Sequence, residues 1–191
     1  GKAYWVKVHE IPEASKASRG THIKSMIAIG ADEEITTVVT LKEFSDEQYL
    51  FMTTMNGVVK KVKTSEFSNA KTRGIIGLKL NAGDKLISAI PTDGNSEVLL
   101  VSRRGKALRF TEEDVRSMGR ASCGIKGLKL AEGDEVAGAI KVIPDESILL
   151  LTEKGYGKRV HFEDFKPHGR GTGGQRIFGN IEDRGEIIGL L

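Results

Sequence analysis

The chain has a single cysteine, Cys123, among its 191 residues, and this scarcity excludes an internal disulfide framework. Its histidines, His9, His22, His161 and His168, are scattered singly, so the sequence offers no Cys/His cluster for zinc. No apolar run approaches the length that crosses a bilayer, and the start of the sequence has no signal-peptide core. We therefore expect a cytoplasmic location.

Aromatic residues are few, at 6%, and the formal net charge is only +3. A weakly basic total does not by itself indicate a nucleic-acid partner, which has to be argued from where the charges lie. With 39% hydrophobic and 29% charged residues, the composition is that of a globular chain. The length is sufficient to bury a core.

What the sequence does contain is a fourfold repeat. In each copy a glycine is followed, nine and ten positions later, by an acid and an apolar residue; these glycines are Gly1, Gly57, Gly105 and Gly155. A period of about 50 residues predicts a solenoid, a propeller or a similar array. We place the repeats at about 1–55, 56–103, 104–153 and 154–191, within one domain that no linker divides.

Short apolar runs rich in β-branched residues, separated by Gly, Asp and Asn, predict four strands in each of the second and third copies. The expected ranges are 57–63, 74–80, 85–91 and 97–102, then 105–110, 124–130, 135–143 and 147–152. Four short strands per repeat favour an all-β, propeller-like wheel of blades over a sandwich. The fourth copy stops where a fourth strand is due, so we expect the chain to be a fragment of a larger wheel.

A loop after the first strand of each copy carries two bases before a glycine. These pairs are Lys16 and Arg19, Lys71 and Arg73, Arg116 and Arg120, and Lys166 and Arg170. Equivalent loops of successive blades lie side by side in a radial array, while the acids gather in another turn, around Asp84 and Asp134. The pattern predicts a positive rim suited to a long, regularly charged partner.

The first strands supply further bases. Four positions after the repeat glycine come Lys61, Arg109 and Arg159, with Trp5 in the first copy, each next to an apolar residue. Strand alternation predicts that the apolar residue enters the core and the base faces outward. A single exposed base of this kind is explained by protection of a strand edge against aggregation. Its recurrence in three copies instead favours contact with a curved phosphate backbone. The neighbouring bases Lys60, Lys158 and Arg176 complete the candidate set.

The sequence gives no sign of catalysis. Segment 169–174 fits the dinucleotide pattern G-x-G-x-x-G, but the periodicity makes the following residues 175–180 a strand, not the helix that this fingerprint requires. The recurring acid indicates a structural turn, because an active site occurs once. A scaffold propeller that binds proteins and has no DNA role remains an alternative.

Five segments, in order along the whole chain, resemble the C-terminal domain of the bacterial DNA gyrase A protein. They are Gly1–Ser15, Asn56–Lys61, Glu66–Asn69, Arg104–Phe110 and Gly155–Arg159. The paralogous C-terminal domain of the topoisomerase IV A protein is the close competitor. The resemblance implies a β-pinwheel, a disc whose blades exchange strands. It also implies that double-stranded DNA wraps around the positive perimeter, in the bacterial nucleoid, and biases strand passage toward negative supercoils.

The same resemblance implies a larger type II topoisomerase around this domain. Its partners are the N-terminal catalytic region of gyrase A and the gyrase B protein, which hold the catalytic tyrosine and use ATP and Mg²⁺. The domain itself is expected to have no catalytic residue, no metal and no cofactor. The family's Q-R-R-G-G-K-G box is absent, and residues 168–175 are a degenerate version of it. If the first copy matches the family's second blade, the box precedes Gly1.

Overall fold

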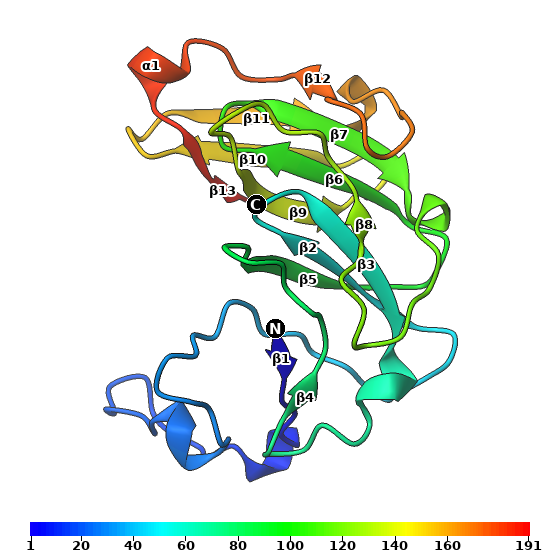
Figure 1. Ribbon diagram of the computed structural model, residues 1–191. Helices are drawn as coiled ribbons and strands as arrows, with labels where there is room; N and C mark the ends of the chain where they lie inside the picture. Colours follow the sequence, from blue (N-terminus) through cyan, green and yellow to red (C-terminus); the bar gives the residue numbers. More distant parts are fainter.

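The computed structural model describes all 191 residues and consists almost wholly of short antiparallel strands (Figure 1). The strands are β1 (Lys2–Ala3), β2 (Tyr49–Thr54), β3 (Val58–Lys63), β4 (Ile75–Ile76), β5 (Leu86–Thr92), β6 (Glu97–Ser102), β7 (Lys106–Thr111), β8 (Ile125–Lys126), β9 (Val136–Lys141), β10 (Ser147–Thr152), β11 (Gly157–His161), β12 (Gln175–Arg176) and β13 (Ile187–Leu190). The predicted all-β class is confirmed.

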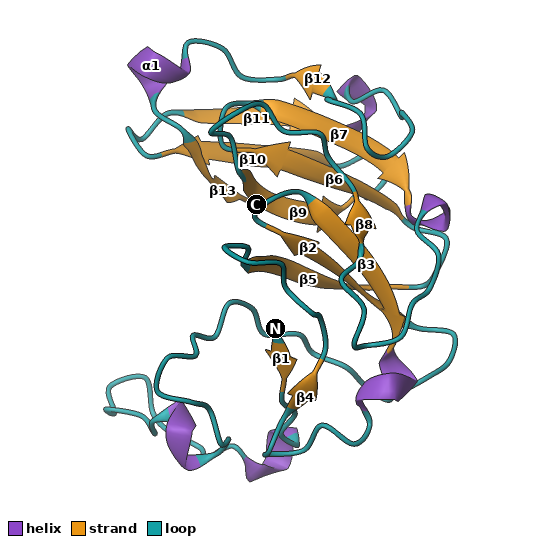
Figure 2. Ribbon diagram, in the orientation of Figure 1, coloured by secondary structure: helices purple, strands orange, loops and turns teal.

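Helical structure is limited to single turns (Figure 2). There is one short α-helix, α1 (Ile181–Arg184), and five 3₁₀ turns, at Val8–Glu10, Ile23–Ser25, Thr64–Phe67, Glu112–Asp114 and Phe162–Asp164. Four of these turns contain the acid that recurs once per repeat, so the structural role predicted for that acid is confirmed.

The strands form two four-stranded sheets, β5-β2-β3-β8 and β12-β7-β6-β9, a three-stranded sheet β11-β10-β13, and the pair β1-β4. The centre of each four-stranded sheet is a hairpin closed by a turn that contains the repeat glycine. Gly57 has a φ of 78°, and a Cβ there would lie 2.6 Å from the carbonyl oxygen of Leu128. Only glycine meets both conditions, which explains why it marks the hairpin turn.

The edge strand of each four-stranded sheet comes from the following repeat. β8 pairs with β3 through Val59↔Ile125, β12 pairs with β7, and β4 in the same way pairs with β1. The second, third and fourth repeats therefore each donate a strand to the blade before them, which is the strand exchange that the resemblance implies.

The exchanged strands are shorter than predicted. Ranges 74–80, 124–130 and 175–180 contain only two strand residues each. The ladder ends because the next two amides both donate to the carbonyl of one repeat glycine, as Gly127 and Leu128 do to Gly57. The chain hooks around that glycine, so strand pairing cannot continue.

The predicted assignment of strands to copies is wrong at two places. Strands 97–102 and 147–152, expected to end copies two and three, pair with β7 and β11 of the following copies. The connecting turns are so short that the two strands close a hairpin, which keeps sequence neighbours adjacent in space. In the first copy, residues 4–48 contain no strand.

Apolar clusters fill the spaces between successive sheets. Phe51 and Val59 of one blade pack against Leu108 and Phe110 of the next, and the two phenylalanine rings lie 6.2 Å apart. Full burial of one such side chain contributes about 1.5–3 kcal/mol. Strand β9 contacts both β5 and β13 toward the middle of the wheel (Figure 1). The exchanged strands β8 and β12, at the opposite edges of their sheets, therefore lie on the perimeter.

Candidate nucleic-acid interface

The exchanged segments carry a row of bases on the perimeter. Lys126 and Arg176 are the exposed residues of β8 and β12, and Lys79 and Lys129 occupy equivalent exposed positions just after the exchanged strands. We call these four residues the perimeter bases. None has a carboxylate within 4.0 Å, so their charges face solvent uncompensated.

Of the perimeter bases, the sequence prediction included only Arg176. Lys79 and Lys129, like Lys126 and Arg176, are separated by one repeat length of 50 residues. That spacing is the signal in the sequence for these positions, which lie outside the paired loop bases.

The paired loop bases divide into two groups. Lys71, Arg73, Arg116 and Lys166 are exposed and form no ion pair, and Lys16 and Arg19 are exposed in the first copy. Arg120 and Arg170 instead turn back onto the preceding repeat. Arg120 Nη1 donates to the carbonyl of Ile76 at 3.0 Å, and Arg170 Nη1 donates to that of Lys126, the equivalent position, at 3.2 Å. These two arginines secure their loops against the exchanged strands.

The bases on the first strands do not behave as predicted. Lys60 is 0% and Lys61 6% exposed, so the expectation that this strand presents its base to a partner is wrong. Arg109 is also turned inward, where it is paired with Glu97, whereas Lys158 and Arg159 are exposed. Strand alternation gives the wrong result because both faces of the blade are covered, one by the next sheet and the other by the preceding blade with the segment exchanged into it.

The position four residues after the repeat glycine is a contact between blades. Its side chain donates to a backbone carbonyl near the 3₁₀ turn of the next repeat: Trp5 Nε1 to Ser68 at 3.2 Å, Lys61 Nζ to Glu112 at 2.9 Å, and Arg109 Nη1 to Phe162 at 2.9 Å. The recurrence of this donor therefore reflects blade packing.

Lys60 joins three segments at one point. Its ammonium donates to the carbonyls of Gly77 and Ser122, each at 3.0 Å, and to that of Arg120. Burial lowers the pKa of Lys60 to about 8, and the carboxylate of Glu66 opposes this shift only in part. Lys158 makes one equivalent contact, from its Nζ to the carbonyl of Ile177 at 2.9 Å.

Stability is expected to rise with pH in alkaline solution because of Lys60. Its pKa is about 8 in the folded chain, below the ordinary value of 10.5, so between these values the unfolded chain binds the extra proton. The free energy of unfolding then increases with pH, by no more than about 1.4 kcal/mol per unit for one proton. Urea denaturation at several pH values should show this rise. A Lys60→Met variant should have a flatter profile, and an identical profile would contradict the assignment.

The glycines that end the third and fourth loops, Gly124 and Gly174, are required by close packing. Gly124 has a φ of 87°, and a Cβ there would lie 2.7 Å from the carbonyl oxygen of Val59. A Cβ at Gly174 would collide in the same way with the carbonyl oxygen of Ala107. In the glycine-dense fourth loop as well, the last glycine is needed so that the exchanged strand β12 can pack closely against β7.

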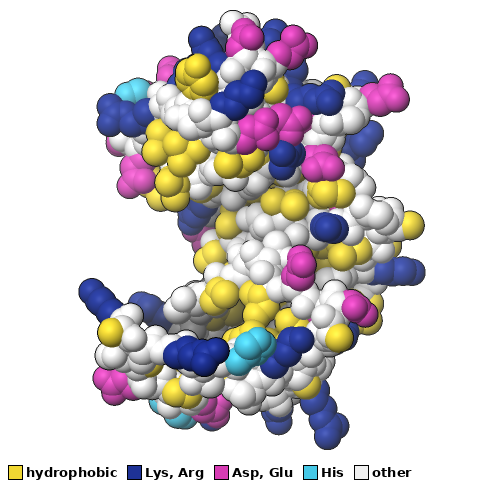
Figure 3. Space-filling model, turned by 90° about the vertical axis from the view of Figure 1, so that its left-hand side faces the viewer, with side chains coloured by type: hydrophobic (Ala, Val, Ile, Leu, Met, Phe, Trp, Pro, Cys, Tyr) yellow, Lys and Arg dark blue, Asp and Glu magenta, His cyan; other side chains and the backbone are white.

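The acids that gather in one turn of each repeat form no ion pair with the perimeter bases. Asp84 and Asp134 are buried, and each accepts hydrogen bonds from two backbone amides beside a hairpin turn, as Asp84 does from Asn56 and Lys85. On the face drawn in Figure 3, both signs of charge mix at the upper end and apolar side chains surround the hollow below it. That face is not uniformly basic.

No cluster of three or more His, Cys, Asp or Glu side chains could hold a metal ion. None of the helices has the length and hydropathy that a membrane-spanning helix requires. The fold and its charges define a propeller-type domain of strand-exchanging blades with a basic perimeter.

Comparison with known proteins agrees with this class. The family described as "DNA gyrase C-terminal domain, beta-propeller" matches residues 1–42, 48–93, 96–143 and 146–191. The chain belongs to this family. The first matched segment, residues 1–42, covers most of the first copy, although the only strand within these residues is β1.

Curated relatives are gyrase A proteins by name. The gyrase A protein of Treponema pallidum is 57% identical over 122 residues, which are 64% of this chain and 15% of that protein. That of Klebsiella oxytoca is 43% identical over 124 residues, or 65% of this chain and 14% of its own length. The chain therefore matches only about one seventh of these relatives.

Two solved structures superpose on almost the whole chain. The C-terminal domain of DNA topoisomerase IV gives a TM-score of 0.86 at 30% identity, covering 96% of this chain and 58% of that one. The DNA gyrase A C-terminal domain gives 0.85 at 29% identity, covering 100% and 62%. The two folds fit equally well, so the preference for gyrase comes from the sequence relatives.

Proposed function

We propose that this domain binds double-stranded DNA along its perimeter through phosphate contacts, without recognising base sequence. The observation that carries the proposal is the row of perimeter bases, which recurs at the repeat length and lacks neutralising carboxylates. Exposed Lys and Arg without ion pairs are available to displace the counterions of a phosphate backbone. Lys71, Arg73, Arg116 and Lys166 extend the positive surface into the adjoining loops.

The geometry of the wheel supports bending of the bound DNA. Equivalent bases on successive blades follow a curve, because the blades are arranged around a common centre. A duplex that contacts each in turn has to bend, and such binding depends on backbone contacts and DNA deformability. Within the whole gyrase, the wrapped segment would bias ATP-dependent strand passage toward negative supercoiling. The N-terminal region of gyrase A and the gyrase B protein would supply the catalytic chemistry.

Binding to duplex DNA is expected to depend steeply on salt. If about six phosphates are neutralised, the affinity falls about a thousandfold between about 50 and 200 mM monovalent salt. Fluorescence anisotropy with a labelled duplex measures this dependence, and a second duplex of unrelated sequence serves as the control. Equal curves for the two duplexes are expected. A salt-independent affinity, or a strong preference for one sequence, would contradict phosphate-based binding.

A further inference from the structure

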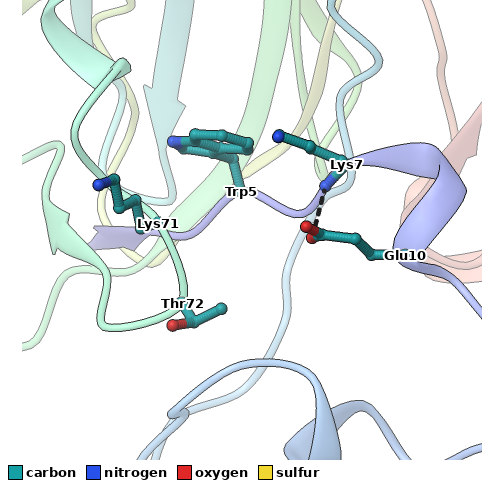
Figure 4. A pocket seen from close by; sticks show the side chains of 5 residues that line it. All are labelled: Trp5, Lys7, Glu10, Lys71 and Thr72. Atoms are coloured by element: carbon teal, nitrogen blue, oxygen red, sulfur yellow. Dashed lines mark hydrogen bonds between the residues drawn. The ribbon is translucent and has the colours of Figure 1, made fainter.

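We propose that a pocket beside Trp5 binds one unstacked nucleotide of single-stranded DNA. This inference rests on the proposed function, because it assumes that DNA is the partner. The pocket is a cavity of about 270 Å³ lined by Trp5, Lys7, Glu10, Lys71 and Thr72 (Figure 4). It lies where the first repeat meets the loop of the second, so two repeats build it.

The indole ring of Trp5 is held in place from two sides. Its Nε1 donates to the carbonyl of Ser68 at 3.2 Å, and Phe44 contacts it edge to face with ring centroids 5.7 Å apart. The ring is only partly buried and borders the cavity. A fixed, partly exposed aromatic ring is a stacking platform for a nucleobase.

Trp5 differs from the residues at the equivalent position. Lys61 and Arg109 also donate to the next repeat, but Lys61 is buried and Arg109 is paired with Glu97. In the first copy the contact with the next repeat needs only the indole N–H, and the part of the ring that Phe44 does not cover borders the pocket.

Two ammonium groups flank the ring. Lys7 and Lys71 are exposed, line the pocket and have no carboxylate oxygen within 4.0 Å. Lys71 has a φ of 40°, which is strained for a residue with a side chain, and its carbonyl accepts a hydrogen bond from the Trp5 amide at 3.3 Å. Backbone strain of this kind tends to occur at functional sites. The strained loop keeps a phosphate-binding charge beside the aromatic ring.

Glu10 and Thr72 add polar groups that suit the edge of a base. One oxygen of Glu10 accepts from the Lys7 amide at 3.3 Å, and its carboxylate faces the cavity with Lys7 and Trp5 (Figure 4). A carboxylate accepts from an exocyclic amine such as N4 of cytosine. The ligand is therefore a nucleotide with an amino-bearing base. In a duplex the faces of the bases are stacked, so the nucleotide must be unpaired or extruded.

The proposal is tested by the fluorescence of Trp5, which is the only tryptophan in the chain. Stacking of a base on the ring is expected to quench its emission. The probe is single-stranded oligodeoxycytidylate of about 12 nucleotides, within the usual site size of single-strand binders. The expected result is saturable quenching by this strand, and weaker quenching by oligothymidylate, whose base lacks the amine. No quenching by either strand, or equal quenching by a duplex, overturns the proposal.

Variants separate the pocket from general charge. Lys71→Asn places a residue that tolerates the left-handed backbone but removes the ammonium group. This variant should bind the single strand about tenfold more weakly. Trp5→Leu, which removes the aromatic ring but keeps an apolar side chain, should weaken the binding of the strand by a similar factor, measured by anisotropy of a labelled strand. Lys24→Ala, an exposed base outside the pocket, is the matched control and should have little effect. An equal loss of affinity for the single strand in Lys24→Ala and Lys71→Asn would overturn the proposal that the pocket binds it.

Two further experiments are needed. The first distinguishes a single strand from a free nucleotide as the ligand, and the second distinguishes failure of the pocket proposal from failure of the proposed duplex binding. Quenching by free dCMP at the concentration that the strand requires would assign the pocket to free nucleotides and overturn the strand proposal. A Lys126→Ala/Arg176→Ala variant should lose duplex affinity yet keep the quenching by oligodeoxycytidylate. If the original chain binds no duplex but is quenched by the strand, the perimeter proposal fails and the pocket stands.

Discussion

Replacement of Glu112 by alanine is expected to lower the free energy of unfolding by about 3–5 kcal/mol. Glu112 is 0% exposed, and its carboxylate accepts from the hydroxyl of Thr92 at 2.7 Å and the amides of Gly94 and Ser96 at 3.0 and 2.8 Å. Its Oε2 also lies 3.9 Å from Nζ of the buried Lys61. Alanine leaves three donors without an acceptor and an ammonium without its counter-charge, and each loss is costly in a dry interior.

Urea denaturation of Glu112→Ala and of Glu113→Ala compares the free energies of unfolding of the two variants. Glu113 is the next residue in the same 3₁₀ turn, but it is exposed and outside this network, so its replacement should cost less than about 0.5 kcal/mol. A Glu112→Gln/Lys61→Met double variant should recover part of the loss, since it removes both buried charges together. Similar unfolding curves for Glu112→Ala and Glu113→Ala would contradict the network.

The parts of the fold that sequence reasoning predicted well are local. Strands 58–63, 97–102, 106–111 and 147–152 were found within one residue because each has apolar residues of suitable period bounded by a turn. The exchanged strands were overestimated because their length is set by a partner in another repeat. The hook of Gly127 and Leu128 around the carbonyl of Gly57 has no trace in the local pattern.

In the candidate interface, too, the local pattern predicts some features and not others. The repeat period identifies positions where a base recurs in successive blades, but it does not distinguish a base that faces solvent from one that connects two blades. Lys61 and Arg109 recur because each blade needs a donor toward the next. Lys126 and Arg176 recur on the perimeter itself. Telling the two cases apart requires knowing which faces neighbouring sheets cover, and that depends on contacts between residues distant in sequence.

Removal of the perimeter bases is expected to cause the largest loss of DNA affinity. In a variant with alanine at Lys79, Lys126, Lys129 and Arg176, four counterion-releasing contacts are lost. The slope of the logarithm of affinity against the logarithm of salt should fall by about 3–4, and the affinity at about 0.1 M salt should fall by about three orders of magnitude. The exposure of these side chains predicts little change in stability.

The matched control removes the same number of charges from bases that already form ion pairs. Lys63 pairs with Asp46, Arg103 and Arg104 with Glu186, and Lys141 with Asp93; alanine at these four bases changes the net charge equally. Three carboxylates, Asp46, Glu186 and Asp93, offset most of these four charges. Fewer counterions are therefore displaced through them, and the salt slope should fall by about one unit at most. Equal losses in the two variants would mean that net charge alone attracts DNA. A loss confined to the first variant places the DNA on the exchanged segments, because the unpaired bases there repeat at the spacing of the blades.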